Sequence, residues 1–214
     1  MKQILKTSLF IFVFGLLMII FSNSKVKAVT KTVTTIQELQ EAMGAIPYST
    51  IEGTTLKITD NFTCSTPYEI DAKIPELTID FNGKEIRIEN EQKTNLGIRL
   101  SEGKITLKDS QGETGGIYST GNFMYLEYGT ELIIENGKYT AGHVQKVENG
   151  LITNLDNGLI KNQGGNITIK NGKFDTVKYA ILLECNSGKT VIDNGNFTGN
   201  GYFVEVRSRR NSLA

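Results

Sequence analysis

The 214-residue chain has no tryptophan, one histidine, two cysteines, three prolines and a formal net charge of zero. A single histidine excludes a metal site built on several imidazoles, and two cysteines exclude both a disulfide scaffold and a four-thiolate zinc site. The balanced charge lacks the basic excess that nucleic-acid binding usually needs. With 39% hydrophobic residues and 22 glycines, the composition is that of one medium-sized globular domain.

The first 28 residues have the pattern of a secretory signal peptide. Lys2 and Lys6 precede an apolar run from Leu9 to Phe21, and Val26-Lys27-Ala28 offers a small-residue cleavage pattern. The run is shorter than the roughly 20 residues that cross a bilayer, which disfavours a retained anchor. Four of the 23 basic residues lie in this leader, so 19 remain against 23 acidic residues. We therefore predict a mildly acidic mature chain from about Val29, outside the cell or at its surface.

Three segments share the pattern Ile-x-Asn-Gly-x-aromatic and begin at Ile134, Ile169 and Ile192. The last two begin 23 residues apart, and the same offset superposes three further pairs: Tyr179 and Tyr202, Ile181 and Val204, and Leu183 and Val206. A fixed period of this length indicates stacked structural units.

Cutting the chain at equivalent points gives six units, with lengths of 23, 27, 26, 36, 23 and 23 residues: 54–76, 77–103, 104–129, 130–165, 166–188 and 189–211. Short alternating stretches such as Ile86-Arg87-Ile88 indicate strands with one buried face, and Asn-Gly, Ser-Gly and Gly-Gly pairs separate them. The spacing of three and four residues that is typical of helical solenoids is absent from residue 54 onward. We therefore predict an all-β fold, a parallel β-helix of about six coils over residues 54–211, with a short tail at 212–214.

Residues 29–53 are predicted to form an N-terminal segment with a short capping helix. Thr35 and Glu38 have the spacing of a capping box, and Gly44 is a stop signal. Between them lies an apolar stripe: Ile36, Leu39, Ala42 and Met43. Such a helix would cover the open end of the apolar interior, as end caps do in solenoids.

The asparagines of the repeated motif, Asn136, Asn171 and Asn194, are predicted to form a ladder at a turn. Asparagine tolerates a left-handed backbone, its amide can hydrogen-bond the equivalent amide one coil away, and the following glycine permits a positive φ. This motif therefore predicts a structural turn rather than a catalytic site.

Tyr118, Tyr125 and Tyr128 lie close together in the third unit. Because exposed aromatic rings in a row can stack on sugar rings, these three tyrosines are the candidate ligand-binding residues. Taken singly, each fits the core or the lining of a groove better than a ligand contact. The sequence indicates no catalytic residue and no metal ligand, and His143 has no nearby residues that would make it a general base.

The unit 130–165 exceeds the 23-residue period by about 13 residues, and it contains a tandem duplication, Glu148–Thr153 and Asp156–Lys161. Insertions in a rigid stack commonly carry function. A harmless extension or a partial extra coil is the simpler alternative.

Three segments carry a resemblance to a known family: Thr34–Ala42, Leu56–Asp60 and Leu77–Ile86. They resemble the opening of the pectate-lyase-like right-handed β-helix domains of secreted and surface proteins of Gram-positive bacteria, which are often described as adhesive. The resemblance implies a right-handed coil and, in many members, a role in binding without catalysis. We therefore expect a secreted module for adhesion that binds a polysaccharide or a surface glycan or protein, without a cofactor and without binding nucleic acid or, once the leader is removed, membranes.

The alternative is a Ca²⁺-dependent polysaccharide lyase, which needs carboxylates that hold Ca²⁺ and an Arg or Lys base on one outer face. Asp193, Glu184 and Glu205 lie near Arg207 in the repeat alignment, and the 23-residue offset predicts an ion pair between Arg207 and Glu184. Ice or mineral binding through threonine ladders is disfavoured, because threonine is not expected to recur in register on a single face. An uncapped last coil would expose strand edges, which predicts end-to-end self-association.

Overall fold

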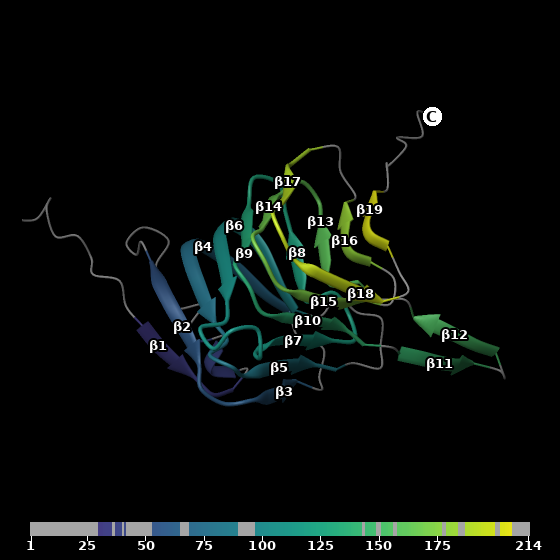
Figure 1. Ribbon diagram of the computed structural model, residues 1–214, viewed down its shortest axis with the longest axis horizontal. Helices are drawn as coiled ribbons and strands as arrows, with labels where there is room; N and C mark the ends of the chain where they lie inside the picture. Colours follow the sequence, from purple (N-terminus) through teal and green to yellow (C-terminus); the bar gives the residue numbers. More distant parts are fainter. Residues whose placement is uncertain are drawn as a thin grey trace, which may run out of the picture.

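The computed structural model of the chain describes residues 30–35, 37–39, 41, 53–64, 69–89, 97–142, 144–148, 151–155, 158–176, 179–183, 187–199 and 202–206. These residues form strands β1 to β19 and almost no helix. Every strand pair among them is parallel except the pair β11–β12. The strands wind into a solenoid in which each coil contributes a strand to each of three faces (Figure 1). The fold is therefore a parallel β-helix, as the sequence predicts.

The three faces are defined by their strands. Face one contains β1 (Thr30–Val33), β2 (Thr54–Ile58), the second halves of β4 (Glu69–Asp80) and β6 (Gly97–Lys108), β9 (Glu131–Ile134), β14 (Asn166–Ile169) and β17 (Thr190–Ile192). Face two contains β3 (Phe62–Cys64), β5 (Glu85–Ile88), β7 (Gly116–Ser119), β10 (Lys138–Ala141), β15 (Lys173–Thr176) and β18 (Asn196–Gly199). Face three contains the first halves of β4 and β6, β8 (Met124–Leu126), β13 (Ile160–Asn162), β16 (Tyr179–Leu183) and β19 (Tyr202–Val206).

The strand register confirms the predicted repeat. The aligned position on face one is occupied in successive coils by a row of aliphatic residues: Leu56, Ile79, Leu107, Ile134, Ile169 and Ile192. Their separations agree with the predicted unit lengths to within one residue. In the last two coils the 23-residue offset holds residue by residue, because Tyr179 pairs with Tyr202 and Ile181 with Val204. Face two has six strands, the number expected for six coils.

Strands β4 and β6 are more than twice as long as any of the other described strands because each runs from face three around a corner onto face one. Their pairing carries register shifts between Ala72 and Lys73 and between Ile74 and Leu77. Such irregularities bend a strand, so one strand can serve two faces. For this reason faces one and three are joined into a single 11-stranded sheet. The short alternating stretches in the sequence mark the two halves but do not show that they are continuous.

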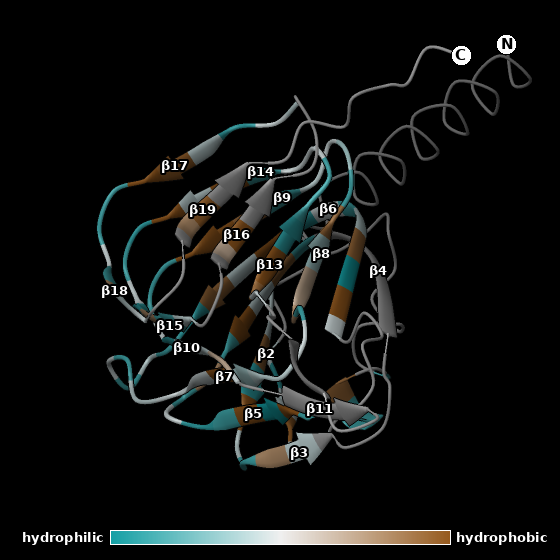
Figure 2. Cartoon of the chain, turned by 90° about the vertical axis from the view of Figure 1, so that its right-hand side faces the viewer, coloured by the Kyte–Doolittle hydropathy of each residue, from teal (hydrophilic) through white to brown (hydrophobic). Residues whose placement is uncertain are grey.

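The core is a column of side chains inside the coils. Hydrophobic and hydrophilic residues alternate along many of the strands (Figure 2), and the hydrophobic ones form the buried core. The rings of Phe123, Tyr139, Phe174 and Phe197 form a stack, with centroid separations of 5.8, 5.1 and 4.9 Å between neighbours. Tyr139 is fully buried, and its hydroxyl donates a hydrogen bond to the carbonyl of Asn136 at 2.9 Å. The buried phenol therefore keeps a partner, which makes its burial tolerable.

The prediction that the motif asparagines hydrogen-bond one another between adjacent coils is wrong. The Asn136 amide bonds to the main chain of Asp109 in the preceding coil, accepting from the N–H at 2.6 Å and donating to the carbonyl at 3.0 Å. Asn171 Nδ2 donates instead to Glu113 Oε1. The left-handed backbone belongs to the following glycines, for example Gly137 at φ 117°. Since glycine adopts this conformation without steric cost, the asparagine is free to bond its neighbouring coil.

The predicted N-terminal cap is confirmed at its first turn. Residues 37–39 are helical, the N–H of Glu38 donates to Thr35 Oγ1 at 3.2 Å, and Leu39 is buried in the core. The Glu38 carboxylate accepts from both the N–H and the hydroxyl of Thr34. Ile36, Ala42, Met43 and Gly44 lie outside the described residues. Strand β1 pairs with β2, so the ladder of face one already begins at Thr30, ahead of this helix.

The insertion in the fourth unit forms a hairpin rather than a partial extra coil. Strands β11 (Val144–Glu148) and β12 (Leu151–Leu155) pair antiparallel and make a separate two-stranded sheet. The hairpin projects beyond the ends of β5, β7 and β10 (Figure 1). Among the described residues there is no helix of the length and hydrophobicity that a membrane span requires.

Candidate functional site

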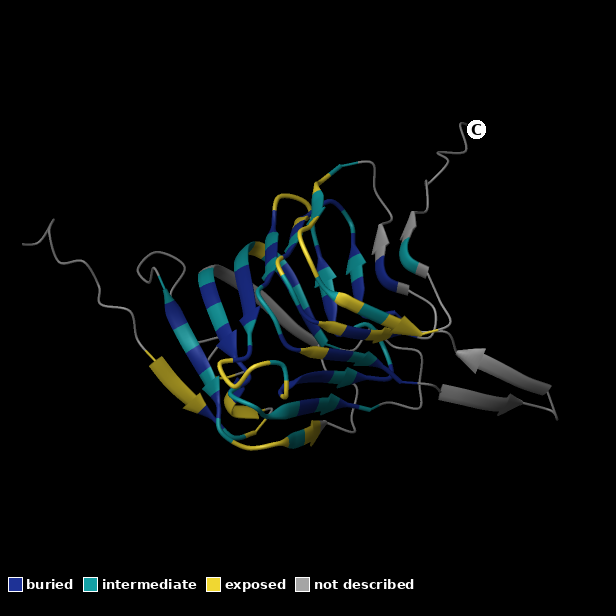
Figure 3. Cartoon of the chain, in the orientation of Figure 1, coloured by how far each residue is buried: buried dark blue, intermediate teal, exposed yellow. Residues whose placement is uncertain are grey.

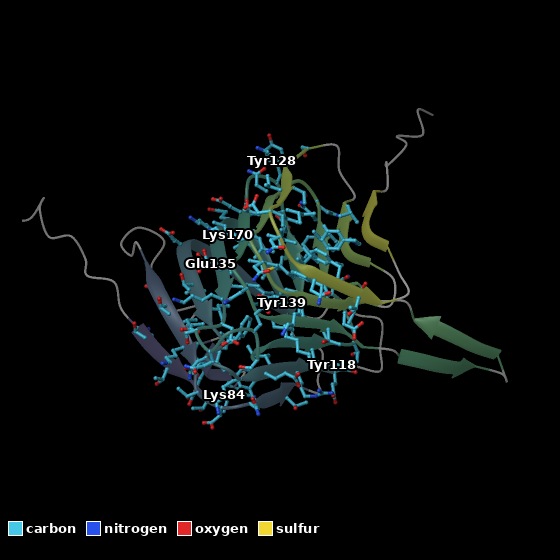
Figure 4. The ribbon with its side chains drawn as sticks, in the orientation of Figure 1. Lys84, Tyr118, Tyr128, Glu135, Tyr139 and Lys170 are labelled. Atoms are coloured by element: carbon cyan, nitrogen blue, oxygen red, sulfur yellow. The ribbon has the colours of Figure 1, made fainter. Side chains whose placement is uncertain are left out.

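The structure places the three candidate tyrosines on different parts of the solenoid. Tyr118 lies on β7 of face two, Tyr125 on β8 of face three, and Tyr128 in the turn between β8 and β9. Tyr118 and Tyr128 lie at opposite sides of the molecule in Figure 4. The three rings therefore do not form one aromatic row, although the chain brings them close together in the sequence.

Tyr118 is covered by a neighbour. Arg87 pairs with it in register from β5, and the Arg87 guanidinium lies 3.9 Å from the centre of its ring. Two carboxylates fix the arginine in this position, since Arg87 bonds to Glu85 and Glu89 at 2.8 Å each. The hydrogen bonds that Arg87 donates to these carboxylates, first to Glu85 and then to Glu89, also raise the pKa of Arg87. The Arg87 guanidinium therefore covers one face of the Tyr118 ring.

Tyr125 lies at the centre of an in-register row on the outer side of face three. Arg99 on β6 pairs with it on one side, and Lys161 on β13 pairs with it on the other. The Arg99 guanidinium and the Lys161 ammonium lie 5.9 and 5.7 Å from the ring centroid. We call Arg99, Tyr125 and Lys161 the basic-aromatic row. An aromatic ring between two cations favours contact with a ligand that is both flat and negatively charged.

A carboxylate anchors one end of the basic-aromatic row. Arg99 Nε donates to Glu127 Oε1 at 2.7 Å, and its Nη2 donates to the same oxygen. The arginine side chain nevertheless remains 43% exposed. Glu127 thus orients the guanidinium beside Tyr125 while leaving part of its surface accessible to solvent.

Tyr128 is the most exposed of the three tyrosines, with 77% of its surface accessible. It precedes Gly129, which has a φ of 79°, in the tight connection from face three to face one. Its ring stands at a corner of the solenoid, apart from the in-register positions of the basic-aromatic row. An isolated exposed ring of this kind is common on protein surfaces and does not by itself indicate a binding site.

The expectation that threonine does not recur in register is wrong. The central outward position of face one carries five threonines in seven successive strands: Thr30, Thr55, Thr78, Thr106, Ile133, Thr168 and Val191. The unequal unit lengths conceal this row in the sequence. Thr106 is only 9% exposed, and charged pairs border the row: Lys104–Glu76, and Lys170–Glu135, which is labelled in Figure 4. Rows of β-branched residues at paired positions stabilise strand pairing.

A buried carboxylate lies at the corner between faces one and two. Asp109 is 2% exposed and accepts hydrogen bonds from four main-chain N–H groups: Gly83 at 2.6 Å, Gln111 at 3.1 Å, Thr114 at 2.8 Å and Gly115 at 2.7 Å. Burial acts to raise the pKa of Asp109, but the hydrogen bonds outweigh it, and the pKa lies below its usual range. With its acceptor sites occupied by the main chain, this residue serves the loop between β6 and β7.

The described part of the chain holds no group of three or more His, Cys, Asp or Glu residues arranged to bind a metal ion. Of the carboxylates considered for a Ca²⁺-dependent lyase, Asp193 is exposed at the edge of the last coil. Glu184 and Arg207, whose ion pair the repeat predicts, lie outside the described residues, as does His143.

Sequence reasoning missed Arg99 and Lys161. The two residues are 62 positions apart in the chain, and they lie in units of different length. Arg99 stands between the buried residues Ile98 and Leu100, and Lys161 stands between the buried residues Ile160 and Asn162, which marks both as outward positions. Only the register shows that both flank Tyr125.

Comparison of the chain with family models, curated proteins and solved structures found no match.

Proposed function

We propose that this chain is a secreted binding module of the pectate-lyase-like, right-handed β-helix type, and that it holds an acidic polysaccharide at a cell surface. The observation that carries the proposal is the basic-aromatic row Arg99–Tyr125–Lys161 on face three. The signal-peptide pattern of residues 1–28 supports export, so the ligand is expected outside the cell.

The chemistry of the row suits a sugar acid. A tyrosine ring packs against the apolar C–H face of a sugar ring, and flanking cations form charge-assisted hydrogen bonds with carboxylates. Parallel strands hold successive side chains about 4.8 Å apart along the solenoid, without rearrangement on binding. Since a polysaccharide is itself a linear repeat, it can lie along the row and contact all three side chains.

Binding to acidic polymers tests the proposal. The mature chain is titrated with polygalacturonate and alginate, and with a neutral glucan as reference, by isothermal calorimetry or affinity electrophoresis. We expect binding to the acidic polymers that weakens with added salt, because salt screens the contribution of the cations. We expect Tyr125→Ala to raise the dissociation constant about tenfold, since it removes the stacking surface.

Matched variants elsewhere on the surface serve as controls. Tyr128→Ala removes an exposed tyrosine outside the row, and Lys170→Gln removes an exposed lysine from face one, where it pairs with Glu135. Both are expected to bind as the parent chain does, whereas Lys161→Gln weakens binding. Equal losses in the variants and their controls, or equal binding of the neutral glucan, would contradict the proposal.

A further inference from the structure

We propose that the β11–β12 hairpin joins two copies of this chain, with β12 of one copy pairing antiparallel with β12 of the other. The inference rests on the backbone arrangement and the sequence of the hairpin. It is independent of the basic-aromatic row.

The hairpin stands apart from the solenoid. Its two strands pair only with each other among the described strands, and it projects past the ends of the face-two strands (Figure 1). In water, an isolated two-stranded hairpin is marginally stable, and three or more strands are needed for independent stability. An additional strand would therefore stabilise the hairpin.

The solenoid does not need the hairpin to close its coil. The register pairs Thr140 with Asp175 and Ile160 with Ile181. Residues 142–157 thus occupy the place where the next coil has only residues 177–178. The next coil connects the same two faces without an insertion, so the hairpin is an addition to a scaffold that is complete without it.

The two free edges of the hairpin differ in composition. Strand β11 reads Val-Gln-Lys-Val-Glu and carries two charges, whereas β12 reads Leu-Ile-Thr-Asn-Leu and carries neither charge nor proline. Natural proteins protect exposed sheet edges against pairing with charged residues, prolines or coverage. Strand β12 has no such protection in its sequence, which favours it as the edge that pairs.

The sequence of β12 complements itself in an antiparallel arrangement. A two-fold axis through Thr153 sets Leu151 opposite the partner's Leu155 and Ile152 opposite the partner's Asn154. Apolar pairs then stand at both ends and a pair of threonines at the centre, which are favourable cross-strand combinations. The result is a symmetric four-stranded sheet, which exceeds the minimum for stability, and a closed two-fold contact that leads to a dimer and not to a filament.

Thr153→Glu is the decisive substitution. Within the hairpin Thr153 pairs with Lys146, so the new carboxylate stands opposite a cation and the hairpin is retained. Across the two-fold axis the same carboxylate meets its own copy, and like charges directly opposite disfavour pairing. By sedimentation velocity over a wide range of concentrations, we expect the parent chain to dimerise reversibly and T153E to dimerise about tenfold or more weakly. The control Q145E adds the same charge to β11 and leaves dimerisation unchanged.

Replacing residues 142–157 with the two residues Val177-Lys178 of the next coil provides a second variant. It is expected to be monomeric at every concentration while keeping the circular dichroism and melting behaviour of the solenoid. A parent chain that stays monomeric overturns the proposal. Dimers that survive both T153E and the hairpin replacement also overturn it, and would assign association to the strand edges of the last coil.

Discussion

At the scale of single residues, the corners of this solenoid depend on side chains that bond the main chain of a neighbouring coil. Asp109 gathers four N–H groups, of which that of Gly83 belongs to the preceding coil. Asn136 bonds both main-chain groups of Asp109 from the following coil. These hydrogen bonds link each corner to the corner of the next coil. They also satisfy main-chain N–H and C=O groups that are not paired within the strands.

The Asp109 carboxyl is expected to make stability depend on pH. Its pKa is lowered in the folded chain below the ordinary value of 3.8, so the carboxylate stabilises the fold above that value. This contribution is lost as the pH falls through the folded-state pKa, because the unfolded chain then binds the proton more readily. At neutral pH, Asp109→Asn should lower the free energy of unfolding by about 1–3 kcal/mol.

Denaturant unfolding at a series of pH values measures this effect. The difference between the parent chain and D109N should shrink as the pH falls below about 4. Asp175→Asn, on the exposed outer side of face two, is the matched control and should change little at any pH. A pH-independent difference for D109N would show that the loop, and not the charge, is responsible.

At the scale of elements, short strands contribute to stability by stacking their inward side chains on those of the coils above and below. Phe174 on β15 lies between Tyr139 and Phe197, at centroid separations of 5.1 and 4.9 Å, and is 1% exposed. Phe197 on β18 is only partly buried, because β18 is at the edge of its sheet. The position of a strand in the stack therefore decides how much its aromatic residue contributes to the free energy of unfolding.

Truncation of these two phenylalanines should reveal the difference. Phe174→Ala leaves a cavity between two rings and is expected to lower the free energy of unfolding by about 3–5 kcal/mol. Phe197→Ala removes the same side chain from a partly exposed site and should cost about half as much or less. Urea unfolding measures the free energy of unfolding of both variants. Equal losses would show that Phe197 is as well packed as Phe174, which would contradict this expectation.

The elements themselves could be predicted only in part. Alternation identified the inward residues of strands such as β5 and β14, and the Ile-x-Asn-Gly-x-aromatic motif located the corner between faces one and two correctly. The hairpin and the continuity of β4 and β6 around a corner were not predicted. One strand that bends around a corner and two strands that end at the corner have the same local alternation of apolar and polar residues. Alternation therefore could not distinguish the two arrangements.

At the scale of the whole molecule, the solenoid is a one-dimensional stack in which each coil contacts only its neighbours. Among the strands, exposed residues are most frequent on β1 and β18, near the two ends of the stack, and β17 has no buried residue (Figure 3). The central strands β6, β9 and β14 pair on both sides, whereas β1 and β17 pair on one. Stability should therefore be greatest in the middle coils and least at the ends.

Hydrogen exchange measured by mass spectrometry tests this gradient. Peptides covering β6, β9 and β14 should exchange about tenfold or more slowly than peptides covering β1 and β17, because the end coils can open without disrupting the middle. Uniform protection along the stack would instead mean that the chain opens as one cooperative unit.

The repeat length, the alternation and the corner glycines already dictate a stacked β-solenoid, because these signals are local and every coil repeats them. The composition of each outer face depends on which residues of neighbouring coils lie side by side. That pairing follows from the lengths of the connections and from the bends in β4 and β6. Those features set the register that aligns Arg99, Tyr125 and Lys161, lines up the threonines of face one and separates Tyr118 from Tyr128. A coil longer or shorter by one residue turns a side chain to the other side of its strand, so only the three-dimensional stack decides which outward residues form a row.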